Sequence, residues 1–106
     1  MTKTFRSLAV LAVAVCLAGA MSLAESSGQA TYKAKCAMCH GADGLAATPM
    51  GKNMKILSFK APEMVKASDA QFIASTKNGK GKMPAYNGKL TDAQIKDVVS
   101  YIRTLQ

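Results

Sequence analysis

The sequence lacks tryptophan, and aromatic residues make up only 6% of its 106 residues. Acidic residues are also scarce, with 6 Asp and Glu against 14 Lys and Arg. A chain of this length forms one domain at most. Its basic character would ordinarily suggest nucleic acid as a partner. The shortage of aromatics for base stacking and the absence of an arginine-rich stretch argue against that class.

No apolar run reaches the length of about 20 residues that a membrane span requires. Lys3 and Arg6 precede a shorter apolar run over residues 8–17, and small residues follow it. This order is typical of an export signal. We therefore predict a signal peptide over residues 1–24, cleaved after Ala24, and one domain over residues 25–106. The predicted location is the periplasm, and a retained membrane anchor is the alternative.

Cysteine and histidine are also rare, but two of the three cysteines and the single histidine lie within five residues. Cys36-Ala37-Met38-Cys39-His40 has the C-x-x-C-H spacing at which c-type haem is attached. Cys36 and Cys39 would bond to the two haem vinyl groups as thioethers, and His40 would be the proximal axial ligand of iron. The third cysteine, Cys16, is expected to leave with the signal peptide. We predict one covalent haem c with its iron.

Two other sites use a C-x-x-C pair. A thioredoxin-type redox pair belongs to a βαβ pattern, which the sequence does not show. A structural zinc site needs four ligands, and the exported chain has only three Cys and His residues. A domain of this size also has little apolar surface to bury, so a haem held at its centre would supply much of the core.

The second axial ligand decides between an electron carrier and an open haem site. Five methionines lie after residue 24: Met38, Met50, Met54, Met64 and Met83. Met83 differs from the others because Pro84 stiffens the chain next to it and because it lies in an extended loop between two predicted helices. Met54 and Met64 are weaker contenders. Ligation by His40 and Met83 would raise the reduction potential relative to two imidazoles and close the iron to oxygen.

All periodic segments indicate helices. Capping-box spacing occurs at Ser26, Ser68 and Thr91, and Pro62 is typical of the first turn of a short helix ending near Lys66. The helix from Ser68 should end at Asn78 and Gly79. The last helix has one apolar stripe: Ile95, Val98, Val99, Ile102 and Leu105. Residues 50–60 are expected to be irregular, with four inward side chains: Met54, Ile56, Leu57 and Phe59.

Two details of the haem region stay open at this point. Gly28 and Tyr32 share a helical face that Val98 and Tyr101 would cross, so Gly28 either permits a close approach of helices or belongs to a frayed helix start. The carbonyl near Pro49 is a candidate acceptor for the second ring N–H of His40. Pro49 is otherwise an ordinary turn proline.

These residues together resemble a small monohaem class I cytochrome c of the bacterial type. The resemblance covers residues 25–106 through YKAKCAMCH, the Gly-Ala-Asp-Gly and Thr-Pro-Met-Gly-Lys turns, KMPAY at residues 82–86, and the final helix. It implies an all-α fold of three to four helices around one haem, with crossed terminal helices. It also implies that Pro49 orients His40 through its carbonyl, and that Tyr86, often Phe in the family, packs near haem.

The expected function is one-electron transfer in the periplasm between respiratory or dehydrogenase partners, by a monomer that is not an enzyme. Removing Lys3 and Arg6 leaves a net charge of +6, which favours acidic docking partners, including membrane complexes. The candidate docking lysines are Lys35, Lys52, Lys80, Lys82 and Lys89, which otherwise only solubilise the surface. A haem enzyme or gas sensor with an open sixth site is the alternative, and a haem-free C-x-x-C oxidoreductase is a third.

Overall fold

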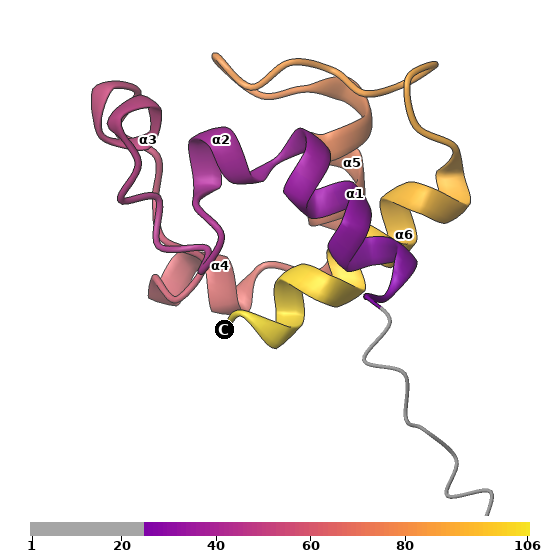
Figure 1. Cartoon of the computed structure of the whole chain (residues 1–106), viewed down its shortest axis with the longest axis horizontal. Helices are drawn as coiled ribbons and strands as arrows, with labels where there is room; N and C mark the ends of the chain where they lie inside the picture. The colour runs from indigo at the N-terminus through magenta and orange to yellow at the C-terminus, as the bar shows by residue number, and fades with distance from the viewer. Residues whose placement is uncertain (1–24) are drawn as a thin grey trace, which may run out of the picture.

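A computed structural model describes residues 25–106, and the predicted signal peptide with its cleavage site lies outside the described residues. Within this range the chain forms six helices and no strand, which confirms the all-α prediction (Figure 1). They are α1 (Ser27–Lys35), α2 (Ala37–His40), α3 (Pro49–Asn53), α4 (Pro62–Lys66), α5 (Asp69–Asn78) and α6 (Asp92–Thr104). The expected three to four helices correspond to α1, α4, α5 and α6, and the short α2 and α3 are additional.

The predicted helix starts are confirmed by their hydrogen bonds. Ser68 and Thr91 each form a complete capping box, in which the N-cap side chain accepts from the backbone of the third helical residue and that residue's glutamine side chain accepts in return. At α1 only half of the box forms, because Ser26 accepts from Gln29 N–H without a reciprocal bond. Pro62 is the first residue of α4, as expected.

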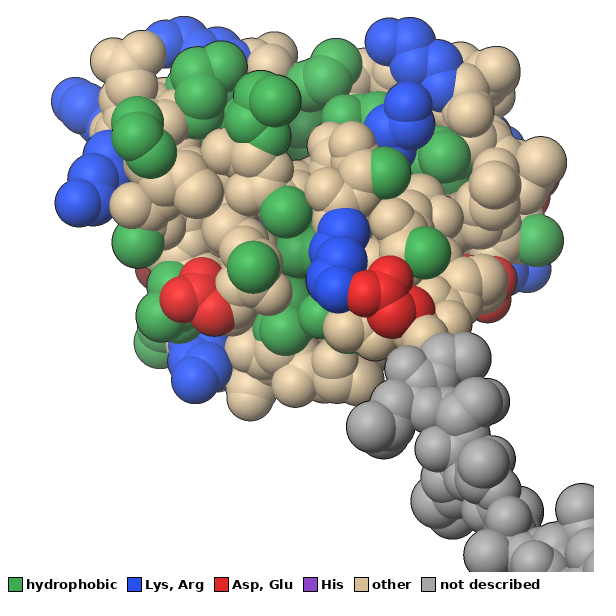
Figure 2. Space-filling view, viewed as in Figure 1, with side chains coloured by type: hydrophobic (Ala, Val, Ile, Leu, Met, Phe, Trp, Pro, Cys, Tyr) green, Lys and Arg blue, Asp and Glu red, His purple; other side chains and the backbone are tan. Residues whose placement is uncertain are grey.

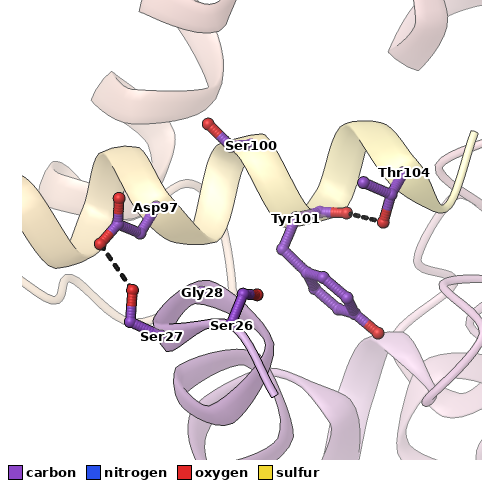
Figure 3. A pocket seen from close by; sticks show the side chains of 7 residues that line it. All are labelled: Ser26, Ser27, Gly28, Asp97, Ser100, Tyr101 and Thr104. Atoms are coloured by element: carbon purple, nitrogen blue, oxygen red, sulfur yellow. Dashed lines mark hydrogen bonds between the residues drawn. The ribbon is translucent and has the colours of Figure 1, made fainter. Parts of the chain in front are cut away.

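The two terminal helices, α1 and α6, pack against each other at Gly28, which settles the question left open by the sequence (Figures 1 and 3). A Cβ atom built on Gly28 would lie 2.2 Å from the backbone oxygen of Asp97 and 3.3 Å from the Tyr101 Cβ. Only glycine permits this approach of the two backbones. Ser27 Oγ donates to Asp97 Oδ2 over 2.9 Å beside the contact.

The apolar core is formed by this helix pair and the aromatic residues that cover it. Its buried members are Tyr32, Cys36, Phe59, Phe72, Val98, Val99 and Ile102. Ile95 is also buried, so four members of the stripe predicted on the last helix face inward, while Leu105 follows the helix as its C-cap and is half-buried. The core thus reaches from the α1–α6 contact to Cys36, the first cysteine of the haem motif.

Residues 50–60 differ from the prediction in two ways. The segment begins inside a short helix, α3, because Pro49 stands at its first position and Thr48 caps it by accepting from Gly51 N–H. Leu57 is 52% exposed instead of inward, whereas Phe59 is buried and Met54 and Ile56 are half-buried. A single capped turn is too short to show helical periodicity in the sequence. An irregular segment has no repeat from which the direction of a side chain could be predicted.

None of the helices in residues 25–106 is both long enough and apolar enough to cross a membrane. In the space-filling view, hydrophobic side chains gather along the upper part of the visible face, in the region of α2 (Figure 2). Met38 on α2 is 75% exposed. The C-x-x-C-H turn therefore presents an exposed apolar side chain at the surface.

Candidate functional site

The C-x-x-C-H motif lies on a single helical turn that follows a break in the first helix. Cys36 ends α1 with φ −115° and ψ −34°, and its N–H still donates to the Tyr32 carbonyl over 2.8 Å. The Cys36 carbonyl then accepts from the N–H groups of Cys39 and His40. These bonds hold Cys39 and His40 on the single turn of α2, with Cys36 as its N-cap, and bring the three residues together as the motif requires.

The two thiols are not bonded to each other. Burial, followed by the nearby Cys39, raises the pKa of the Cys36 thiol to about 11. A thiol with a raised pKa stays protonated at neutral pH and is a poor redox nucleophile. This disfavours the thioredoxin-type alternative and leaves both sulfur atoms available for thioether bonds.

His40 supplies a half-buried imidazole. Burial lowers its pKa below the ordinary value, which favours the neutral ring that binds a metal. Its Nδ1 atom is buried and has no hydrogen-bond partner among the described residues. The ring instead stacks on Phe59, with centroids 4.7 Å apart and planes 18° apart.

The prediction that the carbonyl near Pro49 accepts from His40 is therefore wrong in this structure. Pro49 is the first residue of α3, and carbonyl groups in a helix point along its axis. The carbonyl of Cys39, next to His40 in the sequence, already accepts a hydrogen bond, since Thr48 Oγ1 donates to it over 2.8 Å. Thr48 thus ties the start of α3 to the haem turn, a role that the sequence analysis missed although Thr before Pro is a recognisable capping signal.

Met83 lies in the loop between α5 and α6, as predicted, and it is half-buried. Two backbone hydrogen bonds with Lys80 close a tight turn before it, of 3.2 and 3.0 Å. Gly79 has φ +76°, and a Cβ atom there would lie 2.7 Å from the Met83 carbonyl oxygen. The backbone at Met83 is therefore closely defined on its N-terminal side, and Pro84 restricts it on the other.

Tyr86 joins the Met83 loop to the haem turn. Its hydroxyl donates to the Lys35 carbonyl over 3.0 Å, and its N–H donates to the Thr76 carbonyl on α5. Burial raises the pKa of Tyr86, with further contributions from Cys36 and Cys39. The residue three positions after Met83 thus lies beside the start of the C-x-x-C-H turn.

The five candidate docking lysines are all exposed, and none takes part in an ion pair within the described part of the chain. Lys80 and Lys82 belong to the turn before Met83, and the Lys35 carbonyl accepts the hydrogen bond from the Tyr86 hydroxyl. Lys89 lies 5.8 Å from the centre of the Tyr86 ring. Four of the five are therefore tied to the Met83 loop, and Lys52 lies on α3.

Comparisons with known proteins agree with this geometry. The family described as "Cytochrome C oxidase, cbb3-type, subunit III" matches residues 24–102. Cytochrome c-555 of Chlorobaculum thiosulfatiphilum is 39% identical in an 82-residue alignment that covers 73% of this chain and 91% of the relative. Cytochrome c6 of Thermosynechococcus vestitus is 30% identical in a 105-residue alignment that covers 96% of this chain and 91% of the relative.

Cytochrome c6 of Synechocystis sp. is 35% identical over 71% of this chain and 60% of the relative. Among solved structures, the c-type cytochrome KustC0563 superposes with a TM-score of 0.69 at 30% identity, covering 74% of this chain and 96% of that one. The chain therefore belongs to the cytochrome c family. The resemblance found in the sequence and the class I fold are confirmed.

Membership of the cytochrome c family implies a covalently bound haem c with iron, as predicted. The residues of this chain fit that group: two free thiols share one turn with a half-buried imidazole whose pKa is lowered by burial, which favours the neutral ring. Its relatives are electron carriers, so the chain is an electron carrier and not an enzyme. That finding removes the haem-enzyme alternative.

Proposed function

We propose that residues 25–106 form a periplasmic one-electron carrier, with haem c attached through Cys36 and Cys39 and ligated by His40 and Met83. The observation that supports this most directly is the single turn carrying both free thiols and the half-buried imidazole. The bound haem supplies a reversible one-electron iron couple. The protein residues hold the iron's ligands in place and limit access of water.

The support for Met83 as the second axial ligand is the backbone geometry of its loop. The Lys80–Met83 turn, Gly79 and Pro84 define the backbone on both sides of Met83. The Tyr86 hydrogen bond to Lys35 holds that loop beside the haem turn. A thioether is a soft ligand that stabilises reduced iron, which suits a carrier of moderately high potential.

Optical spectra of the exported protein test this ligation. Met83→Ala should abolish the weak far-red absorption band that marks sulfur bound to ferric haem iron, and should open the reduced protein to carbon monoxide. Met54→Ala and Met64→Ala are matched controls at half-buried methionines and should keep the band. A band that survives Met83→Ala, or disappears in one of the controls, would refute the assignment of Met83. Carbon monoxide binding to the unmodified reduced protein would favour a gas sensor.

The electrostatic part of the proposal concerns acidic partners. Two stretches that meet at the Tyr86–Lys35 hydrogen bond, residues 26–42 and 70–91, contain no Asp or Glu. Lys35, Lys80 and Lys82 are exposed there. Opposite charge on a partner, such as a membrane complex, would therefore steer it to this side, and the effect should weaken with added salt.

Charge reversal tests the docking side. Lys80→Glu combined with Lys82→Glu should slow electron transfer to an acidic redox partner and flatten its dependence on ionic strength. Lys60→Glu combined with Lys66→Glu makes the same change in charge at exposed positions before and on α4. Equal effects of the two pairs would show that only net charge matters and would exclude a docking role for the loop.

The export part of the proposal is tested by cell fractionation and N-terminal sequencing. We expect a monomer in the periplasm whose first residue is Glu25. A protein that keeps residues 1–24 and sediments with membranes would show an anchor instead.

A further inference from the structure

The tripeptide Asn-Gly-Lys occurs twice in the chain, on either side of Met83. One copy spans residues 78–80 and the other spans residues 87–89. An asparagine followed by glycine is the dipeptide most prone to deamidation, because glycine has no side chain to hinder attack by its own nitrogen. Since the two copies have the same sequence, a difference in their reactivity would come mainly from the structure around them.

The first copy lies at a packed helix end. Asn78 is the last residue of α5, and Gly79 is half-buried. A Cβ atom on Gly79 would lie 2.7 Å from the Met83 carbonyl oxygen and 3.0 Å from the Ala85 nitrogen. Lys80, the next residue, exchanges two backbone hydrogen bonds with Met83. Rotation of the peptide between Asn78 and Gly79 would therefore press on the neighbouring backbone and open this turn.

The second copy lies in an open turn. The Lys89 N–H donates to the Tyr86 carbonyl over 2.9 Å, and Gly88 has φ +83°, as the third residue of such a turn often does. Asn87 and Gly88 are both exposed, and no atom beyond their neighbours in the chain lies within 4 Å of the place that a Cβ on Gly88 would take. The Gly88 N–H donates none of the backbone hydrogen bonds of residues 25–106. Its nitrogen therefore has room to approach the Asn87 side chain.

We propose that Asn87 is a site of spontaneous deamidation, through a cyclic succinimide formed with Gly88. The Gly88 backbone nitrogen attacks Cγ of Asn87, so that a new C–N bond closes the ring. The bond from Cγ to the side-chain nitrogen breaks, and that nitrogen leaves as ammonia with the proton of the Gly88 N–H. Water then opens the ring, giving aspartate when it attacks Cγ and isoaspartate when it attacks the backbone carbonyl carbon. The reaction consumes only water.

Either product places a carboxylate in a part of the chain that has none. Residues 70–91 contain no Asp or Glu, and the new negative charge would lie two residues from Lys89, which is exposed. The effect on docking rests on the proposed function, in which acidic partners are steered to Lys35, Lys80 and Lys82, whereas the modification site itself does not depend on it. The deamidated protein should attract such partners less strongly at low salt.

The test ages the haem-loaded protein in mildly alkaline buffer and follows it by cation-exchange chromatography and peptide mass spectrometry. We expect a new, less basic form that elutes earlier and whose change maps to Asn87, while Asn78 stays intact. In the same protein unfolded by guanidinium chloride, both asparagines should react at similar rates, because the packing around the first copy is then lost. The unfolded sample thereby shows that the conditions suffice for the reaction.

Two matched variants identify the reacting residue. Asn87→Gln should stop the conversion of the folded protein, because glutamine would have to close a larger ring, which forms more slowly. Asn78→Gln makes the same change in the other copy and should age like the parent protein. The proposal would be overturned if the change mapped to Asn78, if both asparagines reacted equally in the folded protein, or if the folded protein stayed unmodified while the unfolded chain reacted.

Electron transfer to an acidic redox partner tests the consequence separately. Asn87→Asp has the charge of the aspartate product and should slow the reaction at low salt, and added salt should remove the difference from the parent. A variant that reacts like the parent at low salt would contradict docking on this side of the molecule. That failure would concern the proposed function, whereas the chromatographic result alone decides whether Asn87 is the modification site.

Discussion

Replacing Gly28 with alanine should separate the terminal helices (Figure 3). The new Cβ would lie 2.2 Å from the Asp97 oxygen and 2.7 Å from its carbonyl carbon. Both are backbone atoms, which cannot rotate away as a side chain would. Overpacking of this kind costs about 1–3 kcal/mol. Alanine recovers at most about 1 kcal/mol of helix propensity. Because the clash is with backbone, we take the upper end and expect a net loss of about 2 kcal/mol.

Thermal unfolding of the haem-loaded protein, followed by far-ultraviolet circular dichroism, measures this loss. For a domain of this size, 1 kcal/mol corresponds to about 4–8 °C, so Gly28→Ala should lower Tm by roughly 8–16 °C. Ala30→Gly is the control at an exposed position of the same helix, where only propensity changes and the loss should stay near about 1 kcal/mol. An unchanged or raised Tm in Gly28→Ala would refute the close contact of α1 and α6.

Two further predictions follow from the tyrosine hydroxyl groups. Tyr32→Phe leaves the buried Gly41 carbonyl without its 2.6 Å partner and should cost about 1–3 kcal/mol in chemical denaturation. Because burial raises the pKa of Tyr32, stability should fall as pH rises above about 10, and the Phe variant should lose that part of the slope; equal slopes would contradict this reasoning. Tyr86→Phe removes the bond to Lys35 and should cost about 1 kcal/mol while speeding displacement of the distal ligand by added imidazole. An unchanged displacement rate would show that this bond does not hold the loop.

Features set by neighbouring residues were predictable from the sequence. The caps at Ser68 and Thr91, the start of α4 at Pro62 and the end of α5 before Gly79 all depend on bonds within a few positions, and each is confirmed. The C-x-x-C-H turn is equally local, since Cys36, Cys39 and His40 share one helical turn. The spacing of residues within such a motif therefore determines their local geometry.

Features set by distant residues were not predictable. Gly28 allowed two interpretations because the backbone that requires a glycine there, at Asp97, lies 69 positions away in the sequence. The hydrogen bond predicted at Pro49 failed because α3 begins there and turns that carbonyl along the helix. Phe59 was expected to point inward, but its stacking on His40 depends on how the loop folds back over Gly44.

Proton nuclear magnetic resonance of the reduced protein, with its methionine methyl groups labelled, tests the central claim most directly. A methionine bound to haem iron lies over the ring current, which moves its methyl resonance far upfield of every other methyl group. We expect one such resonance, assigned to Met83 because Met83→Leu removes it. The absence of any upfield methyl, or its assignment to Met54 or Met64, would contradict ligation of the carrier's iron by His40 and Met83.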